Sequence, residues 1–84
     1  MVNTTKLNEA IAKAGLLKDV LAKELGITRQ NFYYKMTNQV QFKASEILYL
    51  KEKLNLCSEE VMEIFFDPKY VPQALSEEVV NGNN

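Results

Sequence analysis

The side chains in this sequence best suited to chemistry are the cations between Glu24 and Glu46, because no acid stands among them. Arg29, Lys35 and Lys43 occupy this window and would meet an anionic partner with an unopposed positive field. The sequence contains no histidine and a single cysteine, so it lacks the commonest general base and a zinc ligand set. We therefore expect binding rather than catalysis, with no metal and no cofactor.

Other residue types narrow the class of protein further. Gly15, Gly26 and Gly82 are scattered singly, so no glycine-rich phosphate loop is present and nucleotide hydrolysis is not expected. Cys57 can form no intrachain disulfide, which fits a reducing compartment, and we expect it to be buried in packing. No window approaches the roughly 20 apolar residues that span a bilayer. The sequence thus predicts a soluble, cytoplasmic protein that is not an enzyme.

The net charge of −1 conceals two parts of opposite sign. Residues 1–56 contain nine basic and five acidic side chains, a net charge of +4. Residues 57–84 contain one basic and six acidic side chains, a net charge of −5. A basic body followed by an acidic end keeps an anionic partner possible despite the whole-chain charge.

The 84 residues suffice for one compact core, and the spacing of apolar residues predicts five helices and no strand. Gly15 and Gly26 stand where left-handed residues end helices, and Thr28 stands where a capping side chain begins one. Asn55 is placed to stop the fourth helix, and Asp67-Pro68 ends the fifth. The predicted helices cover about residues 5–14, 17–25, 29–36, 44–54 and 58–66.

Local signals also predict how the fourth helix begins and what the core contains. Lys43 takes the N-cap position, Glu46 stands at N3, and Phe42 can pack on Ile47 as a hydrophobic staple. We expect one helical domain over residues 1–66 and an extended or disordered acidic tail over 67–84. The predicted core residues are Leu21, Ala22, Leu25, Phe32, Ile47, Leu50 and Leu54.

The segment from Leu21 to Phe32 has the composition of a helix-turn-helix. Ala22 lets two helices cross closely, Gly26 permits the turn between them, and Ile27 helps to fill the wedge. The run Leu21-Ala22-x-x-Leu25-Gly26-Ile27-Thr28-Arg29-Gln30-x-Phe32 resembles the lambdoid-phage repressor and Cro family. The likeness continues through Phe42, Glu46-Ile47, Leu50 and Leu54-Asn55-Leu56 to Ile64-Phe65-Phe66, and is similar to small regulators from phages and prophages of Gram-positive bacteria.

The sequence departs from the family pattern at the start of the second helix. Leu17 replaces the usual capping Thr or Ser, which should cost that helix about 1 kcal/mol. Lys18 stands where the family usually has Gln, so it can reach a phosphate but cannot make the amide hydrogen bonds that brace the third helix.

The resemblance implies a five-helix bundle of the lambda-repressor-like DNA-binding type, with the third helix in the major groove of double-stranded DNA. Arg29 can form two hydrogen bonds with guanine, and Gln30 two with adenine. The base-contacting residues that it implies are Arg29, Gln30, Asn31, Tyr33 and Tyr34. The phosphate-contacting residues, which fix register without reading sequence, are Lys18, Thr28, Lys35, Asn38, Gln39 and Lys43.

The fifth predicted helix is more apolar than one buried face requires, which suggests a partner. Regulators of this kind usually dimerise so that two third helices reach successive turns of DNA. We expect a homodimer; the alternative is that these residues close the core of the monomer. The expected interface residues are Leu48, Tyr49, Val61, Met62, Phe65 and Phe66.

The expected function is a repressor or Cro-like transcription regulator that binds a short, near-palindromic operator in a bacterial host cell. The alternative is a protein-interaction module, such as an antirepressor or inhibitor, that uses the helical scaffold or the acidic end. DNA binding through phosphates weakens steeply with salt, which separates the two hypotheses.

Overall fold

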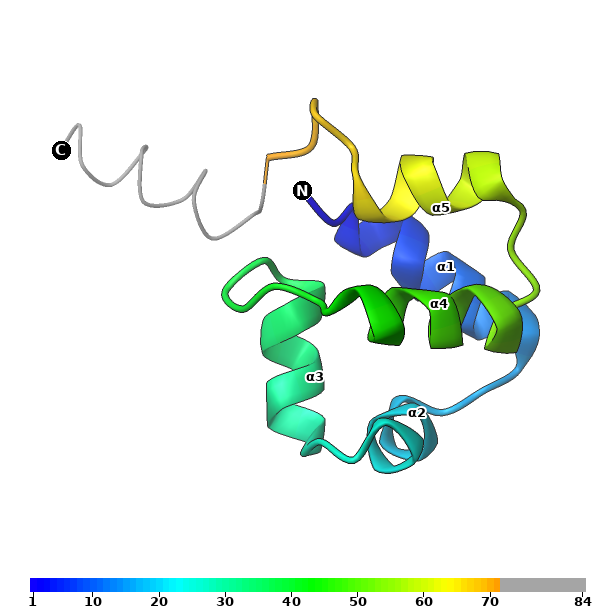
Figure 1. The fold of residues 1–84 in the computed structure, drawn as a ribbon, viewed down its shortest axis with the longest axis vertical. Coiled ribbons are helices and arrows are strands. Elements are labelled where there is room, and N and C mark those ends of the chain that lie inside the picture. The colour runs from blue at the N-terminus through cyan, green and yellow to red at the C-terminus, as the bar shows by residue number, and fades with distance from the viewer. Residues whose placement is uncertain (72–84) are drawn as a thin grey trace, which may run out of the picture.

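The computed structural model describes residues 1–71, which form five helices and no strand (Figure 1). The all-helical prediction is confirmed, and each helix begins within one residue of its predicted start. Of the predicted tail, residues 72–84 lie outside the described part of the chain. The helices are α1 (Thr4–Ala14), α2 (Lys18–Leu25), α3 (Arg29–Met36), α4 (Ala44–Lys53) and α5 (Ser58–Phe65).

The helix ends follow from single residues in the sequence. Gly15 and Gly26 adopt φ angles of 70° and 74°, so they end α1 and α2 in the left-handed conformation that side chains disfavour. Asn55 has a φ of 55° just after α4, as its predicted role as a helix stop requires. These residues turn the chain sharply enough for successive short helices to pack on one core.

The helix starts are capped by different means. Thr28 Oγ1 accepts a hydrogen bond from the Asn31 N–H at 3.0 Å, which fixes the first turn of α3. The Glu46 carboxylate accepts the Lys43 N–H at 2.8 Å at the start of α4. Leu17 offers α2 no side-chain cap, as its apolar side chain predicts. The predicted N-cap positions of α3 and α4 are therefore confirmed.

One core cluster takes buried side chains from all five helices; α2 packs against α3, and α5 packs against α1 and α4. The Phe42 ring stands edge-on to Phe32, with centroids 6.0 Å apart, and to Phe65, with centroids 5.5 Å apart. Leu25 and Ile47, predicted as core, are only partly buried. The buried apolar residues are Val2, Leu7, Ile11, Leu21, Ala22, Phe32, Met36, Leu50, Leu54, Leu56, Ile64 and Phe65.

The first three residues are part of the fold, which the sequence did not suggest. Val2 is buried, and its N–H and C=O both bond to the Asn38 side chain. The Asn3 N–H donates to the Ile64 carbonyl at 2.6 Å. The Met1 carbonyl accepts the Asp67 N–H at 3.0 Å. The N-terminal segment thus joins the α3–α4 loop to the end of α5.

Cys57 does not lie where we expected it. The residue precedes α5 and is exposed, whereas the sequence suggested buried packing. Its N–H donates to the Glu60 carboxylate at 2.9 Å, so the backbone of this position serves the start of α5. The adjacent Leu56 is buried instead.

Candidate nucleic-acid interface

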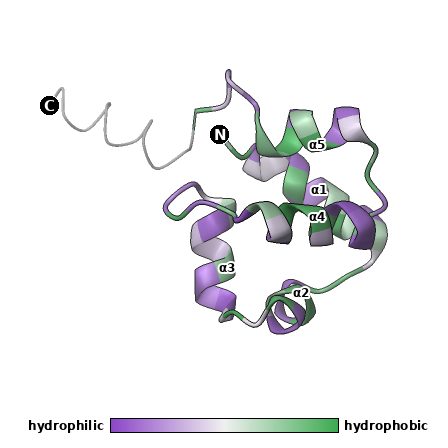
Figure 2. Ribbon diagram, in the orientation of Figure 1, coloured by the Kyte–Doolittle hydropathy of each residue, from purple (hydrophilic) through white to green (hydrophobic). Residues whose placement is uncertain are grey.

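Helix α3 lies along one edge of the molecule (Figure 1). Its residues divide into a buried face and an open face. Phe32, Lys35 and Met36 make up the buried face. Arg29 and Gln30 are exposed in the first turn, and the hydrophilic colours of α3 gather near its junction with α2 (Figure 2). The open face therefore presents hydrogen-bonding side chains at the N-terminal half of a well-anchored helix.

Arg29 meets an acid from the preceding helix. Its Nε lies 3.0 Å from Oδ1 of Asp19, and the two side chains are 74% and 64% exposed. Asp19 stands in the first turn of α2, so the pair spans the turn centred on Gly26. The guanidinium thus has an acidic neighbour, and both side chains face solvent.

The other predicted base-contacting residues lie along the same helix. Gln30 Nε2 donates to the Tyr34 hydroxyl at 2.7 Å, one turn further on. The rings of Tyr33 and Tyr34 lie side by side with centroids 6.2 Å apart. Tyr33 is exposed, whereas Asn31 and Tyr34 are half-buried. The structure brings all five predicted residues to one helix, with Arg29, Gln30 and Tyr33 the most open.

Four of the predicted phosphate-contacting residues are open to solvent at least in part. Lys43 is exposed before α4, and Lys18 is half-buried at the start of α2. Gln39 is exposed in the α3–α4 loop and donates to Thr37 Oγ1 at 3.1 Å. Thr28 is exposed and caps α3. These residues lie at the starts of α2, α3 and α4 and in the α3–α4 loop.

Lys35 is a correction, because its ammonium group lies inside the molecule. Lys35 Nζ contacts both carboxylate oxygens of Glu46 at 2.6 and 2.7 Å, and the two side chains are 4% and 8% exposed. A buried ion pair holds its charges where DNA phosphates cannot approach. Lys35 therefore joins α3 to α4 and is not a phosphate contact.

The Glu46 carboxylate accepts three hydrogen bonds from two residues and remains ionised within the fold. Burial raises its pKa, but the hydrogen bonds from Lys35 and from the Lys43 N–H outweigh burial and leave the pKa below its usual value. Glu46 thus caps α4 and pairs with α3 through the same carboxylate.

Asn38 is a second correction. Its Oδ1 accepts the Val2 N–H at 2.7 Å, and its Nδ2 donates to the Val2 carbonyl at 2.9 Å. The residue is half-buried and adopts a positive φ of 69°. Its amide therefore holds the N-terminal segment rather than standing free for a phosphate.

The stretch between Glu24 and Glu46 contains no acid in the sequence, but acids from outside it lie beside its cations in the fold. Of its three cations, Arg29 is paired with Asp19 and Lys35 with Glu46, and both acids come from outside the window. Within residues 1–71, only Lys43 of the three forms no ion pair. The expected unopposed positive field is therefore wrong.

The predicted dimer residues divide into open and buried ones. Leu48, Met62 and Phe66 are 63%, 59% and 50% exposed, which is high for large apolar side chains. Phe65 is a correction, because it is buried against Phe42 and fills the core of the monomer.

The two remaining interface residues are both half-buried. Tyr49 donates its hydroxyl proton to Glu24 of α2, and burial together with that hydrogen bond raises the pKa of Tyr49 to about 12. Val61 packs against the core. Both therefore have roles within the monomer.

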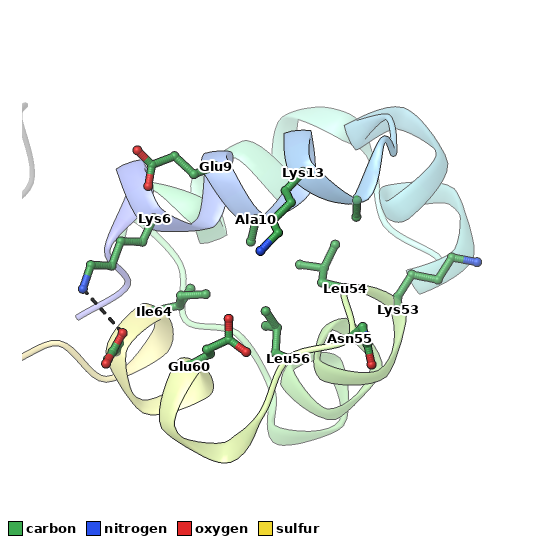
Figure 3. Close-up of a pocket in the computed structure, with 12 residues that line it drawn as sticks. Lys6, Glu9, Ala10, Lys13, Lys53, Leu54, Asn55, Leu56, Glu60 and Ile64 are labelled. Carbon is green, nitrogen blue, oxygen red and sulfur yellow. Dashed lines mark ion pairs between the residues drawn. The ribbon is translucent and has the colours of Figure 1, made fainter.

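A groove with a volume of about 610 Å³ lies between α1, the α4–α5 loop and α5 (Figure 3). Its lining includes the apolar side chains Leu54, Leu56 and Ile64, with charges of both signs around them. Lys6 and Glu63 form an ion pair of 3.7 Å at one end. No lining residue comes from α2 or α3, so this groove is separate from the candidate interface.

Sequence reasoning missed two acids that shape the interface. Glu46 was assigned only a capping role, although Phe32, Lys35 and Met36 share one helical face and so place a lysine toward the core. Asp19 carried no signal, since ten positions separate it from Arg29 and the fold alone brings them together.

Comparison of the chain with protein-family models, with curated proteins and with solved structures found no match. The longest helix of residues 1–71 has 11 residues, which falls well short of the roughly 20 that cross a bilayer. The same residues contain no group of three metal-ligating side chains.

Proposed function

We propose that this protein is a sequence-specific DNA-binding transcription regulator of the repressor or Cro-like type, with a lambda-repressor-like fold. The observation that supports it most is α3 itself. Its buried face anchors it, its first turn is capped by Thr28, and its open face presents Arg29, Gln30 and Tyr33. Helix-turn-helix proteins read the major groove with the N-terminal residues of such a helix.

In this proposal α3 is the recognition helix and α2 lies across the DNA backbone. Arg29 contacts guanine and Gln30 contacts adenine, each pair discriminating by about 1–3 kcal/mol. Asn31, Tyr33 and Tyr34 make the remaining base contacts. The phosphate contacts are Lys18, Thr28, Gln39 and Lys43.

The operator is near-palindromic in this proposal, because two copies of the protein bind it together. The exposed apolar side chains of Leu48, Met62 and Phe66 supply the contact between the copies, and a symmetric dimer places two α3 helices about 34 Å apart along the DNA. Sedimentation of the protein at increasing concentration, with and without the operator, tests this part. A monomer in complex with the operator would contradict it.

A second candidate function is that of a protein-interaction module, such as an antirepressor. The observations that favour it are the same exposed apolar side chains and the pairing of Arg29 and Lys35 with acids, which weakens attraction to DNA. In that case the affinity for the protein partner would depend only weakly on salt. The protein would also show no preference among DNA duplexes.

The test is selection of preferred duplexes from a randomised double-stranded DNA library, followed by affinity measurements on a selected and a random duplex. The variant R29A/Q30A should lose the preference and stay folded. The control K13A removes one positive charge from the exposed face of α1 and should keep the preference. If the wild-type protein enriches no duplex at about physiological salt, the regulator hypothesis fails and the interaction module takes its place.

A further inference from the structure

Asp19 lies beside Arg29 in an ion pair that is open to solvent. Asp19 and Arg29 are both largely exposed, and exposed ion pairs add little to stability. On a surface that faces DNA, a carboxylate is also repelled by phosphates, so Asp19 works against general attraction to DNA. Because Asp19 weakens general attraction to DNA, we look for its role in specificity.

We propose that Asp19 is a specificity-determining residue that positions the Arg29 guanidinium for guanine; this inference rests on the proposed function. A guanidinium carries one N–H on Nε and four on its two Nη atoms. The contact with Asp19 is made at Nε, 3.0 Å from Oδ1. In this proposal the N–H groups of the two Nη atoms donate to the base.

The Nη atoms of Arg29 carry the donors that guanine requires. Two parallel N–H groups on the Nη atoms match the O6 and N7 acceptors that guanine presents in the major groove. A free arginine side chain samples many rotamers, and holding it in one lowers the entropy lost on binding. Asp19 therefore favours guanine at one position, because it holds Arg29 in a rotamer that can donate two hydrogen bonds to that base.

The position of Asp19 suits this role. It stands in the first turn of α2, whereas Arg29 is the first residue of α3, and Gly26 ends α2 between them. The pair therefore depends on the relative placement of the two helices that contact each other around this turn. Asp19 also complements the N-terminal dipole of α2, a structural role that would affect stability but not base preference.

The experiment uses duplexes selected by the wild-type protein from a randomised library. Dissociation constants are measured for a selected duplex, for the same duplex with the arginine-dependent G·C pair changed to A·T, and for a random duplex. The variant is D19N, which keeps the shape and removes the charge. The control is E52Q, which changes the net charge equally at an exposed position of α4 that forms no ion pair in residues 1–71.

We expect D19N to reduce discrimination at the G·C pair about tenfold and to leave binding of the random duplex equal or slightly tighter. E52Q should leave discrimination unchanged, and D19N should have no effect on it in a protein that already contains R29A. Unfolding of each variant in urea separates a loss of fold from a loss of positioning.

Two results would overturn the role of Asp19 while the proposed function stands. One is that D19N discriminates between the G·C and A·T duplexes as well as the wild type does. The other is that D19N binds the selected duplex more tightly and keeps this discrimination, which would mean that Asp19 competes with the base for Arg29. If the wild-type protein selects no duplex, the proposed function fails and the role of Asp19 fails with it.

Discussion

Replacement of Glu46 by Gln removes the charge of a buried carboxylate and keeps its shape, so E46Q tests the ion pair with Lys35. The Lys35 ammonium lies 2.6 and 2.7 Å from the two carboxylate oxygens, in a place where the lysine side chain is 4% exposed. Loss of one partner from a buried pair costs about 3–5 kcal/mol. A glutamine oxygen can still accept the Lys43 N–H, so the cap of α4 is retained. We expect the free energy of unfolding to fall by about 3 kcal/mol, the lower end of that range.

The double variant K35M/E46Q shows whether this cost comes from a stranded charge. Methionine has a length similar to lysine and no charge, so nothing ionised remains in the buried site. We expect the double variant to recover about 2 kcal/mol relative to E46Q. The assay is urea unfolding followed by circular dichroism at neutral pH, with equal denaturant slopes required for comparison. The exposed substitution E9Q is the control and should change stability by less than about 0.5 kcal/mol.

The reasoning is refuted if E46Q is as stable as the wild type, because the pair would then not be buried in solution. It is also refuted if K35M/E46Q is less stable than E46Q, because Lys35 would then stabilise the fold without the Glu46 carboxylate and would not be a stranded charge.

Acidification should remove the contribution of the Lys35–Glu46 ion pair to the free energy of unfolding. The pKa of Glu46 is lower in the folded protein than in the unfolded chain, so its stabilising effect is complete above about pH 4.3, the unfolded value. It is lost as the pH falls through the lower folded value. The wild type should therefore lose more stability on acidification than E46Q, and equal losses would contradict the prediction.

Three further predictions concern separate parts of the molecule. T28A removes the acceptor for the Asn31 N–H and should cost about 1 kcal/mol in urea unfolding; no change would argue against the cap. One of the four tyrosines, Tyr49, should titrate with a pKa of about 12 in an ultraviolet pH titration, and Y49F should remove this transition. The hydrogen bond from Tyr49 to Glu24 should stabilise the fold below about pH 10, the unfolded pKa, and this stabilisation should be lost as the pH rises through 12. Cys57 should react with a thiol reagent in the folded protein as fast as after unfolding, and strong protection would contradict its exposure.

The helices could be predicted from the sequence because their signals are local. Apolar spacing sets a helical face, and a left-handed glycine or a capping side chain acts within a few residues of its own position. Gly15, Gly26 and Thr28 therefore behave as expected. The same holds for the hydrogen bond between Glu46 and the Lys43 N–H, which joins residues three positions apart.

What the sequence could not supply are partners that only the fold brings together. Lys35 and Glu46 are eleven positions apart, and a lysine looks like a surface residue until its partner is known. The Asn38 amide looks like a loop side chain until Val2 is found against it, 36 positions away. The positive field predicted from the stretch without acids is wrong for the same reason, because Asp19 of α2 pairs with Arg29. Net charge along a chain does not determine charge across a surface.

The way in which the N-terminal segment is held has a consequence for the order of events during synthesis. Residues 1–3 are synthesised before their partners, yet they bond to Asn38, Ile64 and Asp67. Helices α1 to α3 can form while the chain is still growing, but the segment that closes the domain must wait until residue 67 has emerged. A nascent chain paused before that point should hold a loose N-terminus and an incomplete core, and so remain open to proteases and chaperones until the last helix docks.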